Sequence, residues 1–346
     1  MPPTELIPPQ AVNLAVRALC ALPAPVRRLI AGRQISLDGQ RLAPEAQLLL
    51  ALMKLENAVL RDERVDLARR RIERGQRLVD GRRVGGVGVR ALSFPNGIPA
   101  RLYTPAGLPA GSPLLVYYHG GGFVLGSLNV CDSLCRRLAV SAAVRVLSAG
   151  YRLAPEHPFP AAVDDAVAAY EHAVKNAESF GADRGAVAVG GDSAGGNLAA
   201  VVSRLAEPVP ALALLFYPPL DLSGRRPSRD VFAEGFYLTD PDVNWFGDLY
   251  IPVERRKEPK ASPLLAEDLT GFPPTYVATA GFDPLRDDGE EFARRLADAG
   301  VPVVLRRHDD LIHGFANMGG LGGRFAEAVT EAAGALRMGL AIACGK

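Results

Sequence analysis

Apolar positions recur along the chain with two different periods. Residues 43–79 carry apolar side chains at helical spacing, which predicts helices. From residue 87 onward, short apolar runs of strand length alternate with longer helical patterns. This change of period predicts an N-terminal helical segment over residues 1–84 and a larger α/β domain over residues 85–346.

The strand-like runs predict one mostly parallel sheet. The first two runs flank a Pro-Asn-Gly turn and are expected to pair as a hairpin. Helical patterns separate the other runs, and that alternation favours parallel strands with helices on both faces of the sheet. The predicted strands span residues 87–94, 98–103, 114–118, 144–149, 186–190, 211–216, 275–280 and 303–306, and the main helices lie near 163–176, 285–299 and 324–338.

One stretch departs from this alternation. Residues 208–274 are richer in Pro, Asp and Arg than their flanks, and they contain the only tryptophan, Trp245, among several other aromatic residues. We interpret the stretch as an excursion from the sheet that forms a helical lid.

The apolar stretch over residues 11–31 raises the question of a membrane segment. Arginines and prolines interrupt it well short of the ~18–20 apolar residues of a spanning helix, and no basic segment precedes it. Val16, Leu19 and Cys20 recur at helical spacing, which predicts an amphipathic helix. We expect this helix to pack on the body of the protein; peripheral contact with a membrane lipid surface, or with a partner, is the alternative.

Composition and charge argue against several classes of protein. The 346 residues carry a net charge of +1 with 22% charged residues, so nothing indicates a nucleic-acid partner. The charged stretch Arg61–Arg74 is interpreted as a solvated surface. The cysteines are too few and too scattered for a disulfide framework or a metal site, which predicts buried or free thiols and a cytoplasmic location. They are Cys20, Cys131, Cys135 and Cys344.

The central motif is Gly-Asp-Ser-Ala-Gly at residues 191–195, which has the G-x-S-x-G form of a nucleophile elbow. An apolar run enters the motif and a small-residue helical pattern leaves it. The turn is so sharp that Ser193 is expected to take a strained backbone conformation, with its hydroxyl at a helix N-terminus. Alone, the motif also fits a glycine-rich structural turn in any doubly wound sheet, so its interpretation depends on the rest of the chain.

A serine nucleophile needs a base, and the base needs a group that orients it. In an α/β hydrolase these groups follow the serine in the order acid, then histidine. Only His308 and His313 lie beyond Ser193. His313 precedes Gly-Phe in a loop after the last predicted strand and is the predicted base. His308 is flanked by charged residues and is interpreted as a surface residue.

Asp283 is the predicted acid. It lies just past the strand predicted over residues 275–280, and Pro284 fixes the turn into the next helix. Four other aspartates compete for this role, and helix capping or solvation is the preferred interpretation of each. They are Asp287, Asp288, Asp309 and Asp310.

Stabilisation of a developing oxyanion requires backbone N–H groups that a ligand can approach. Gly121 and Gly122 follow a predicted buried strand and have no side chains to obstruct that approach. Together with Ala194, the residue after the nucleophile, they are the predicted donors. His119 precedes the serine and follows a different strand, so we expect it to orient the glycine loop rather than to act as the base.

These motifs together resemble the hormone-sensitive-lipase family of carboxylesterases, the bacterial family IV type, over roughly residues 85–340. The resemblance rests on His-Gly-Gly-Gly-Phe at 119–123, Tyr-Arg-Leu-Ala-Pro-Glu-His at 151–157, Gly-Asp-Ser-Ala-Gly-Gly-Asn at 191–197, Asp-Pro-Leu-Arg-Asp at 283–287 and His-Gly-Phe at 313–315. It implies an α/β-hydrolase sheet and a cap made of the N-terminal helices and an insertion at about 217–260. It also implies hydrolysis of short- to medium-chain esters without a cofactor or metal.

We therefore predict a serine carboxylesterase that hydrolyses small-molecule esters through an acyl-enzyme. Aromatic side chains are candidates to line its substrate pocket, namely Phe123, Phe236, Trp245 and Phe246. An amidase, a deacetylase or an acyltransferase would use the same triad, and a lipase would show interfacial activation. A non-catalytic small-molecule receptor would usually lack the triad histidine. The resemblance makes a dimer possible.

Overall fold

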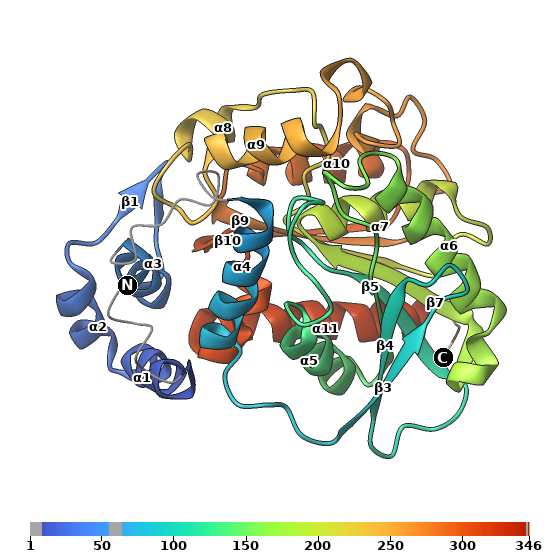
Figure 1. Cartoon of the computed structure of the whole chain (residues 1–346), viewed down its shortest axis with the longest axis horizontal. Helices are drawn as coiled ribbons and strands as arrows, with labels where there is room; N and C mark the ends of the chain where they lie inside the picture. Colours follow the sequence, from blue (N-terminus) through green and yellow to red (C-terminus); the bar gives the residue numbers. More distant parts are fainter. Residues whose placement is uncertain (1–8, 55–63, 344, 346) are drawn as a thin grey trace.

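The computed structural model describes residues 9–54, 64–343 and 345, and its centre is an eight-stranded sheet (Figure 1). The strand order is β10-β9-β8-β7-β5-β6-β4-β3. β4 pairs antiparallel with both β3 and β6, and all other neighbours are parallel, which confirms the predicted mostly parallel sheet. The strands are β3 (Val87–Ser93), β4 (Pro99–Pro105), β5 (Ser112–Tyr118), β6 (Arg145–Ala149), β7 (Ala182–Asp192), β8 (Ala213–Phe216), β9 (Thr275–Phe282) and β10 (Val303–Ile312).

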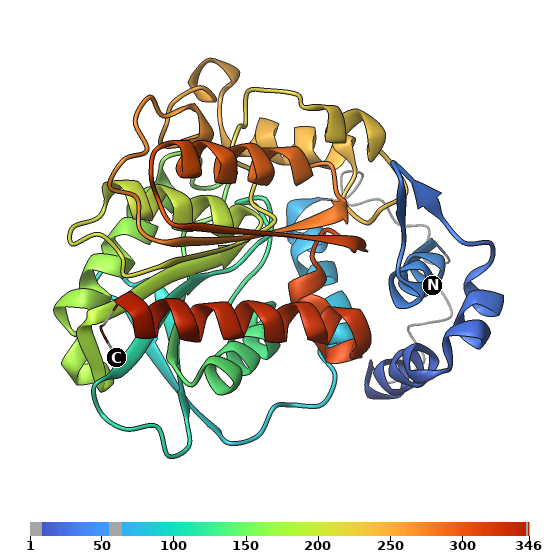
Figure 2. The ribbon, with the colours of Figure 1, turned by 180° about the vertical axis from the view of Figure 1, so that it is seen from behind.

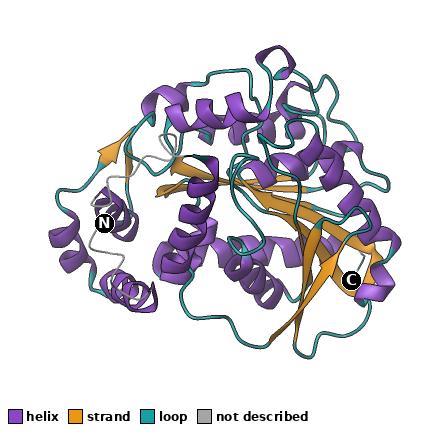
Figure 3. Cartoon of the chain, in the orientation of Figure 1, coloured by secondary structure: helices purple, strands orange, loops and turns teal. Residues whose placement is uncertain are grey.

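Helices cover both faces of this sheet, as predicted. α5 and α11 lie on one face, whereas α6, α7 and α10 lie on the other (Figures 1 and 2). Figure 3 shows the strands enclosed between these layers, and each layer buries its own cluster of apolar side chains against the sheet. The helices are α5 (Asp132–Ala142), α6 (Ala161–Lys175), α7 (Ala194–Leu205), α10 (Arg286–Asp298) and α11 (Gly323–Ala343), with the 3-10 helices η3 (Ala177–Phe180) and η6 (Phe315–Leu321).

The central strands are buried on both faces, as their continuous apolar runs predict. Every residue of β6, β8 and β9 is buried, whereas the edge strand β3 is mostly exposed. Parallel strands point the same way, so their carboxyl ends meet at one edge of the sheet. The loops that follow β5, β7, β9 and β10 therefore lie close together.

The N-terminal segment packs beside the sheet (Figure 1). The helix predicted over residues 11–31 is in fact two helices, because prolines interrupt the run. Cys20 is buried, and Val16 and Leu19 pack against the same apolar cluster as α11, so packing on the body of the protein is confirmed for these residues. The elements are α1 (Pro9–Ala21), α2 (Ala24–Ala31), β1 (Ser36–Leu37), β2 (Gln40–Arg41), α3 (Pro44–Lys54) and α4 (Val65–Val79).

The segment between β8 and β9 leaves the sheet and forms short helices, in agreement with the sequence pattern (Figure 1). α9 begins with a capping box, in which the Thr239 hydroxyl accepts from the Asp242 amide and the Asp242 carboxylate accepts from the Thr239 amide. The elements are α8 (Pro227–Val231), α9 (Asp240–Tyr250), η4 (Val253–Arg255) and η5 (Pro263–Leu265).

The remaining sequence expectations concern membranes, thiols and metals. None of the helices in the described part of the chain is long and apolar enough to cross a membrane. Cys20, Cys131 and Cys135 are buried free thiols, as predicted, and Cys344 lies outside the described residues. Among the described residues, no group of three or more His, Cys, Asp or Glu side chains is arranged to hold a metal ion.

Candidate active site

Ser193 lies at a sharp turn between β7 and α7. β7 ends at Asp192 and α7 begins at Ala194, and the serine between them has φ 52° and ψ −121°, a conformation that is rare for a residue with a side chain. A Cβ atom at Gly195 would overlap the carbonyl oxygen of Tyr118 on the neighbouring strand. The small residues of the motif thus let the helix pass close to β5, which is the requirement of a nucleophile elbow.

Three side chains from different strand ends form a continuous line of hydrogen bonds. The Ser193 hydroxyl lies 3.0 Å from His313 Nε2, and His313 Nδ1 lies 2.7 Å from Asp283 Oδ2. The Asp283 carboxylate is fully buried, and its Oδ1 accepts a 2.8 Å hydrogen bond from the Leu285 amide. The arrangement can therefore accept a proton from Ser193 and stabilise the charge that forms on His313.

The glycine loop after β5 lies beside the elbow. Gly121 and Gly122 have φ values of 123° and 61°, a region that glycine adopts without strain. Neither amide donates to an acceptor within the part of the chain that the structure describes. The Gly120 amide donates to the Asp192 carboxylate at 3.1 Å, which holds the loop against the residue before Ser193.

His119 lies under this loop and is buried. Its Nδ1 is 2.8 Å from the Gly120 carbonyl oxygen, and its ring stacks on Tyr151 with centroids 4.4 Å apart. Burial lowers the pKa of the His119 imidazole to about 4, so the ring is neutral near pH 7 and can donate to that carbonyl. These contacts agree with the expected orienting position of His119.

Asp192 has more contacts than the sequence motif indicated. Its Oδ1 accepts hydrogen bonds from the Tyr117 hydroxyl at 2.9 Å and from the Gly120 amide, and its Oδ2 accepts from the Asn317 amide group at 2.7 Å. Burial raises the pKa of this carboxyl group, and the hydrogen bonds oppose that shift. One carboxylate therefore connects the elbow, the glycine loop and the loop that carries His313.

Of the four predicted pocket residues, Phe246 approaches the glycine loop directly. A Cβ atom at Gly122 would overlap the Phe246 ring, and Trp245 packs edge-on against that ring at 5.0 Å. Phe123 instead stacks on Tyr250 with centroids 3.9 Å apart and is buried.

Phe236 packs inside an aromatic cluster, with Phe232 at 5.7 Å and Phe282 at 5.2 Å. Tyr217 and Tyr237 were not predicted as site residues. The Tyr217 ring lies 4.7 Å from the His313 ring, and a Cβ at Gly314 would lie 3.0 Å from Tyr237. Both tyrosines belong to the aromatic-rich stretch over residues 208–274, and that composition was the feature of the sequence that could have indicated them.

A family model described as the alpha/beta hydrolase fold matches residues 115–317, which include the glycine loop, the elbow, Asp283 and His313. The chain is an α/β hydrolase. The carboxylic ester hydrolase LipN of Mycobacterium tuberculosis is 43% identical over 96% of this chain and 93% of its own length. Esterase LipI and carboxylesterase NlhH of the same organism are 40% and 41% identical over 72% and 70% of this chain and 80% and 77% of their own lengths. This α/β hydrolase is a carboxylic ester hydrolase.

Two further comparisons agree with that assignment. An ethyl acetate hydrolase of Pseudomonas putida is 38% identical over 74% of this chain and 84% of its own length. The crystal structure of an ester hydrolase from the metagenome of Lake Arreo, complexed with a bipyridine phosphonate derivative, superimposes with a TM-score of 0.82 at 41% identity. The superposition covers 86% of this chain and 98% of the chain of the Lake Arreo enzyme.

Two expectations were wrong, namely that His308 is a surface residue and that Asp288 caps a helix or is solvated. His308 is buried at 1% exposure and packs edge-on against Phe315. Its neighbour Arg307 lies on the opposite face of β10 and pairs with Glu290 of α10, so a charged residue next to His308 in the sequence does not place His308 in solvent. Asp288 is also buried, and its Oδ2 accepts from the amides of Leu220 and Asp221. Burial therefore makes each a structural residue rather than a solvated one.

The interpretation of Arg61–Arg74 as a solvated surface also needs correction. Residues 61–63 lie outside the described residues, but Arg69 on α4 is partly buried against the site. Its guanidinium donates to the carbonyl oxygens of Val124 and Ala154 and pairs with Glu156 at 2.7 Å. α4 thus holds the segment that follows the glycine loop.

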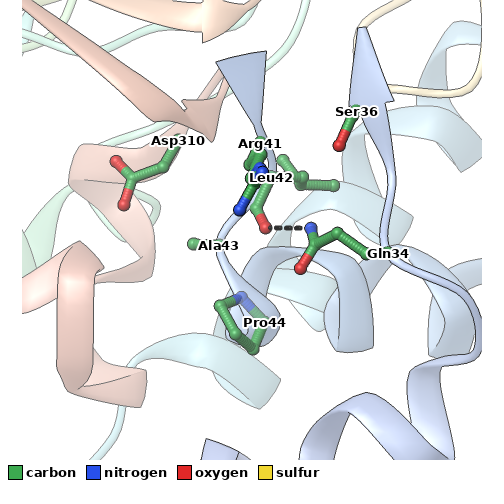
Figure 4. A pocket seen from close by; sticks show the side chains of 7 residues that line it. All are labelled: Gln34, Ser36, Arg41, Leu42, Ala43, Pro44 and Asp310. Carbon is green, nitrogen blue, oxygen red and sulfur yellow. Dashed lines mark hydrogen bonds between the residues drawn. The ribbon is translucent and has the colours of Figure 1, made fainter.

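A pocket elsewhere on the surface is separate from this site (Figure 4). It lies where the N-terminal hairpin meets the end of β10, and none of its lining residues is Ser193, Asp283 or His313. The lining residues are Gln34, Ser36, Arg41, Leu42, Ala43, Pro44 and Asp310.

Proposed function

We propose that this carboxylic ester hydrolase acts through Ser193 as nucleophile, His313 as general base and Asp283 as the group that orients the histidine. The observation that carries the proposal is the hydrogen-bonded line from the Ser193 hydroxyl through the imidazole to a fully buried carboxylate. His313 accepts the hydroxyl proton as Ser193 attacks the ester carbonyl carbon. Asp283 fixes the imidazole tautomer and stabilises the imidazolium.

The reaction then proceeds in two stages, acylation and deacylation, each with its own tetrahedral intermediate. In the first stage the alcohol leaves. The C–O bond to the alcohol breaks, His313 returns the proton to the leaving oxygen, and an acyl-enzyme ester remains on Ser193. A water molecule gives a proton to His313 and attacks the acyl carbonyl. When this second intermediate collapses, the bond from the acyl carbon to Ser193 Oγ breaks, His313 returns the proton to Oγ, and the carboxylic acid is released.

The amides of Gly121, Gly122 and Ala194 stabilise the oxyanion in both stages. Two observations support this role. The amides of Gly121 and Gly122, which donate to no acceptor among the described residues, lie beside the elbow, and Ala194 begins α7, where the helix dipole favours negative charge. Each such donor contributes roughly 2.7–4 kcal/mol to lowering the barrier. His119 and Asp192 hold the loop that presents the glycine amides.

Short- to medium-chain acyl esters are the proposed substrates. The Phe246 ring against Gly122 restricts the space beside the oxyanion position, and the ethyl acetate hydrolase of Pseudomonas putida is a relative. We assign the walls of the substrate site to a cap made of residues 1–84 and about 217–260. Contacts of Phe246, Tyr237 and Arg69 with the loops of the site support that division.

The direct test is hydrolysis of a p-nitrophenyl ester series from acetate to palmitate by the wild type and by Ser193→Ala. We expect a rate that peaks at short or medium chains and disappears in the variant. Matched p-nitroanilides should be poor substrates. If the wild type hydrolysed the anilides but none of the esters, the result would contradict an esterase and indicate an amidase. A wild-type rate that peaks at palmitate would contradict short- to medium-chain esters as the substrate class.

A further inference from the structure

A short hairpin near the N-terminus reaches the loop that carries Asp283. β1 and β2 pair antiparallel, and the two residues between them, Asp38 and Gly39, have φ values of 54° and 73°. Two consecutive left-handed residues are typical of the tight turn that matches the twist of a two-stranded hairpin. The turn therefore presents Asp38 and the adjoining Gln40 in a defined position.

Asp38 and Gln40 contact the two elements that flank Asp283 in the sequence, the start of α10 and the end of β9. The Asp38 carboxylate pairs with the Arg286 guanidinium at 2.6 Å. The Gln40 side-chain amide donates to the Gly281 carbonyl oxygen at 3.3 Å, and a Cβ at Gly281 would lie 2.5 Å from the Gln40 side-chain oxygen. Gly281 lies two positions before Asp283 and Arg286 three positions after it, so the hairpin spans the loop.

The hairpin is itself fixed to the sheet. The Ala43 amide, just after β2, donates to the Asp310 carbonyl oxygen at 2.8 Å, and Leu42 and Ala43 are buried. Gln34, just before β1, donates to the Leu42 carbonyl oxygen at 2.9 Å, so both ends of the hairpin are held together (Figure 4). Because Asp310 is on β10, the hairpin bridges the strand before His313 and the loop of Asp283.

Arg286 connects this hairpin to the aromatic-rich segment. Its side chain is only 9% exposed, and its guanidinium lies 5.0 Å from the centre of the Phe232 ring, a cation–π distance. Phe232 packs in turn on Phe282, the residue before Asp283. The Arg286 guanidinium therefore pairs with Asp38 of the N-terminal hairpin and packs on Phe232 of the segment between β8 and β9.

We propose that Asp38 and Gln40 are positioning residues that hold the Asp283 carboxylate at its hydrogen-bond distance from His313. They touch no reacting atom and act through Gly281 and Arg286. The proposal rests on the function proposed above for Asp283. It assigns to a segment far upstream of the catalytic motifs a part in the geometry of the acid.

This role has a distinct kinetic consequence. An orienting carboxylate stabilises charge that appears on the histidine during the reaction and not in the bound substrate. Loosening it should therefore lower kcat and leave KM nearly unchanged. Loss of one supporting hydrogen bond corresponds to about a two- to tenfold change, so we expect kcat of the Asp38→Asn/Gln40→Leu variant to fall about tenfold or more.

The experiment compares this double variant with Asp38→Glu, which keeps the negative charge, and with Asp298→Asn as matched control. Asp298 forms an exposed ion pair with Arg294 at 2.6 Å on the outer side of α10. Steady-state kinetics with p-nitrophenyl acetate give kcat and KM. The far-downfield proton resonance of the His313–Asp283 hydrogen bond, measured by NMR, reports the geometry without turnover.

We expect the double variant to lose kcat and to show a shifted or broadened downfield resonance, with circular dichroism unchanged. Asp38→Glu, which keeps the charge, should lose less, and Asp298→Asn should stay near wild type. An unchanged kcat and resonance in the double variant would overturn the positioning role and leave the proposed esterase mechanism intact. An equal loss in Asp298→Asn would also overturn it. Failure of the wild type to hydrolyse esters would instead contradict the proposed function. The downfield resonance would still test whether Asp38 and Gln40 position the Asp283 carboxylate.

Discussion

Asn317 donates a 2.7 Å hydrogen bond to Asp192, although the two residues are 125 positions apart in the sequence. This contact ties η6, the 3-10 helix that follows His313, to the end of β7, the strand that leads into Ser193. The backbone carbonyl oxygen of Asn317 accepts from the Gln76 side chain on α4 at 2.9 Å, so the N-terminal segment supports the same 3-10 helix. Ser193 and His313 thus adjoin elements that are joined by a partly buried hydrogen bond.

The direction of that hydrogen bond provides a sharp test. In Asn317→Asp two carboxylates would meet, so we expect this variant to lose roughly tenfold or more in kcat/KM. In Asp192→Asn the Asn317 side chain can turn so that its oxygen, which has no partner among the described residues, accepts from the new amide, and we expect a smaller loss. The reciprocal double variant restores a donor opposite an acceptor and should recover part of the loss in Asn317→Asp. A double variant with strictly additive losses would show that the contact does not position the site.

Substitution of Asp283 by asparagine keeps the shape of the side chain but removes the charge that orients His313. We expect kcat for p-nitrophenyl acetate to fall about 10³–10⁴-fold. Asp309→Asn, an exposed aspartate that competed for the role in the sequence, is the matched control and should be near wild type. Activity near wild type in Asp283→Asn would mean that another group orients the histidine.

The convergence of Ser193, Asp283 and His313 was predictable from the sequence because the topology restricts it. Carboxyl ends of parallel strands meet at one edge, so a serine after one predicted strand, an aspartate after another and a histidine after a third had to converge. Chain order alone separated His313 from the histidines that precede Ser193. The structure brings these residues within hydrogen-bond distance of one another.

The supporting contacts were not predictable in the same way. The partners of Asp192, and the contact of Gln40 with Gly281, join segments whose proximity no local pattern encodes. His308 shows a different limit. It is flanked by charged residues in sequence, but a strand alternates its faces, and the burial of its inward face depends on α11 and Phe315.

Burial of His308 predicts a pH-dependent cost in stability. Neither ring nitrogen has a hydrogen-bond partner in the described part of the chain, and burial lowers the pKa of the imidazole from its ordinary 6.5 to about 4. The unfolded chain therefore binds a proton more readily, and stability falls as the pH drops below about 6.5. Charged groups around the ring modify this shift: Glu331 and Asp310 raise the pKa, and Arg306 and Arg324 lower it.

We therefore expect His308→Leu to be more stable than the wild type at pH 7. Its advantage in free energy of unfolding should grow by about 2 kcal/mol at pH 5. Urea unfolding at both pH values measures the difference. Asp80 and Asp288, whose pKa values burial raises to about 6, favour the folded state as the pH falls, so only the difference between variants isolates the histidine. Exposed His157→Gln is the control, and a pH-independent advantage of His308→Leu would contradict the expectation.

Phe246 should limit the size of the acyl group if its ring bounds the space beside Gly122. We expect Phe246→Ala to raise the ratio of kcat/KM for p-nitrophenyl octanoate to that for acetate by about tenfold, the lower end of what a single methylene is worth in a hydrophobic pocket. Phe180→Ala is the matched control, because Phe180 ends η3 and its ring contact is with His172 on α6. An unchanged ratio in Phe246→Ala would place the acyl chain elsewhere.

Covalent labelling tests the central claim most directly, because only an activated serine reacts rapidly with a fluorophosphonate. Intact-mass spectrometry should show one adduct per chain in the wild type, and peptide mapping should locate it on Ser193. Ser193→Ala should remain unlabelled and His313→Ala should react far more slowly. An adduct on a different residue, or equal labelling of wild type and Ser193→Ala, would contradict Ser193 as the nucleophile.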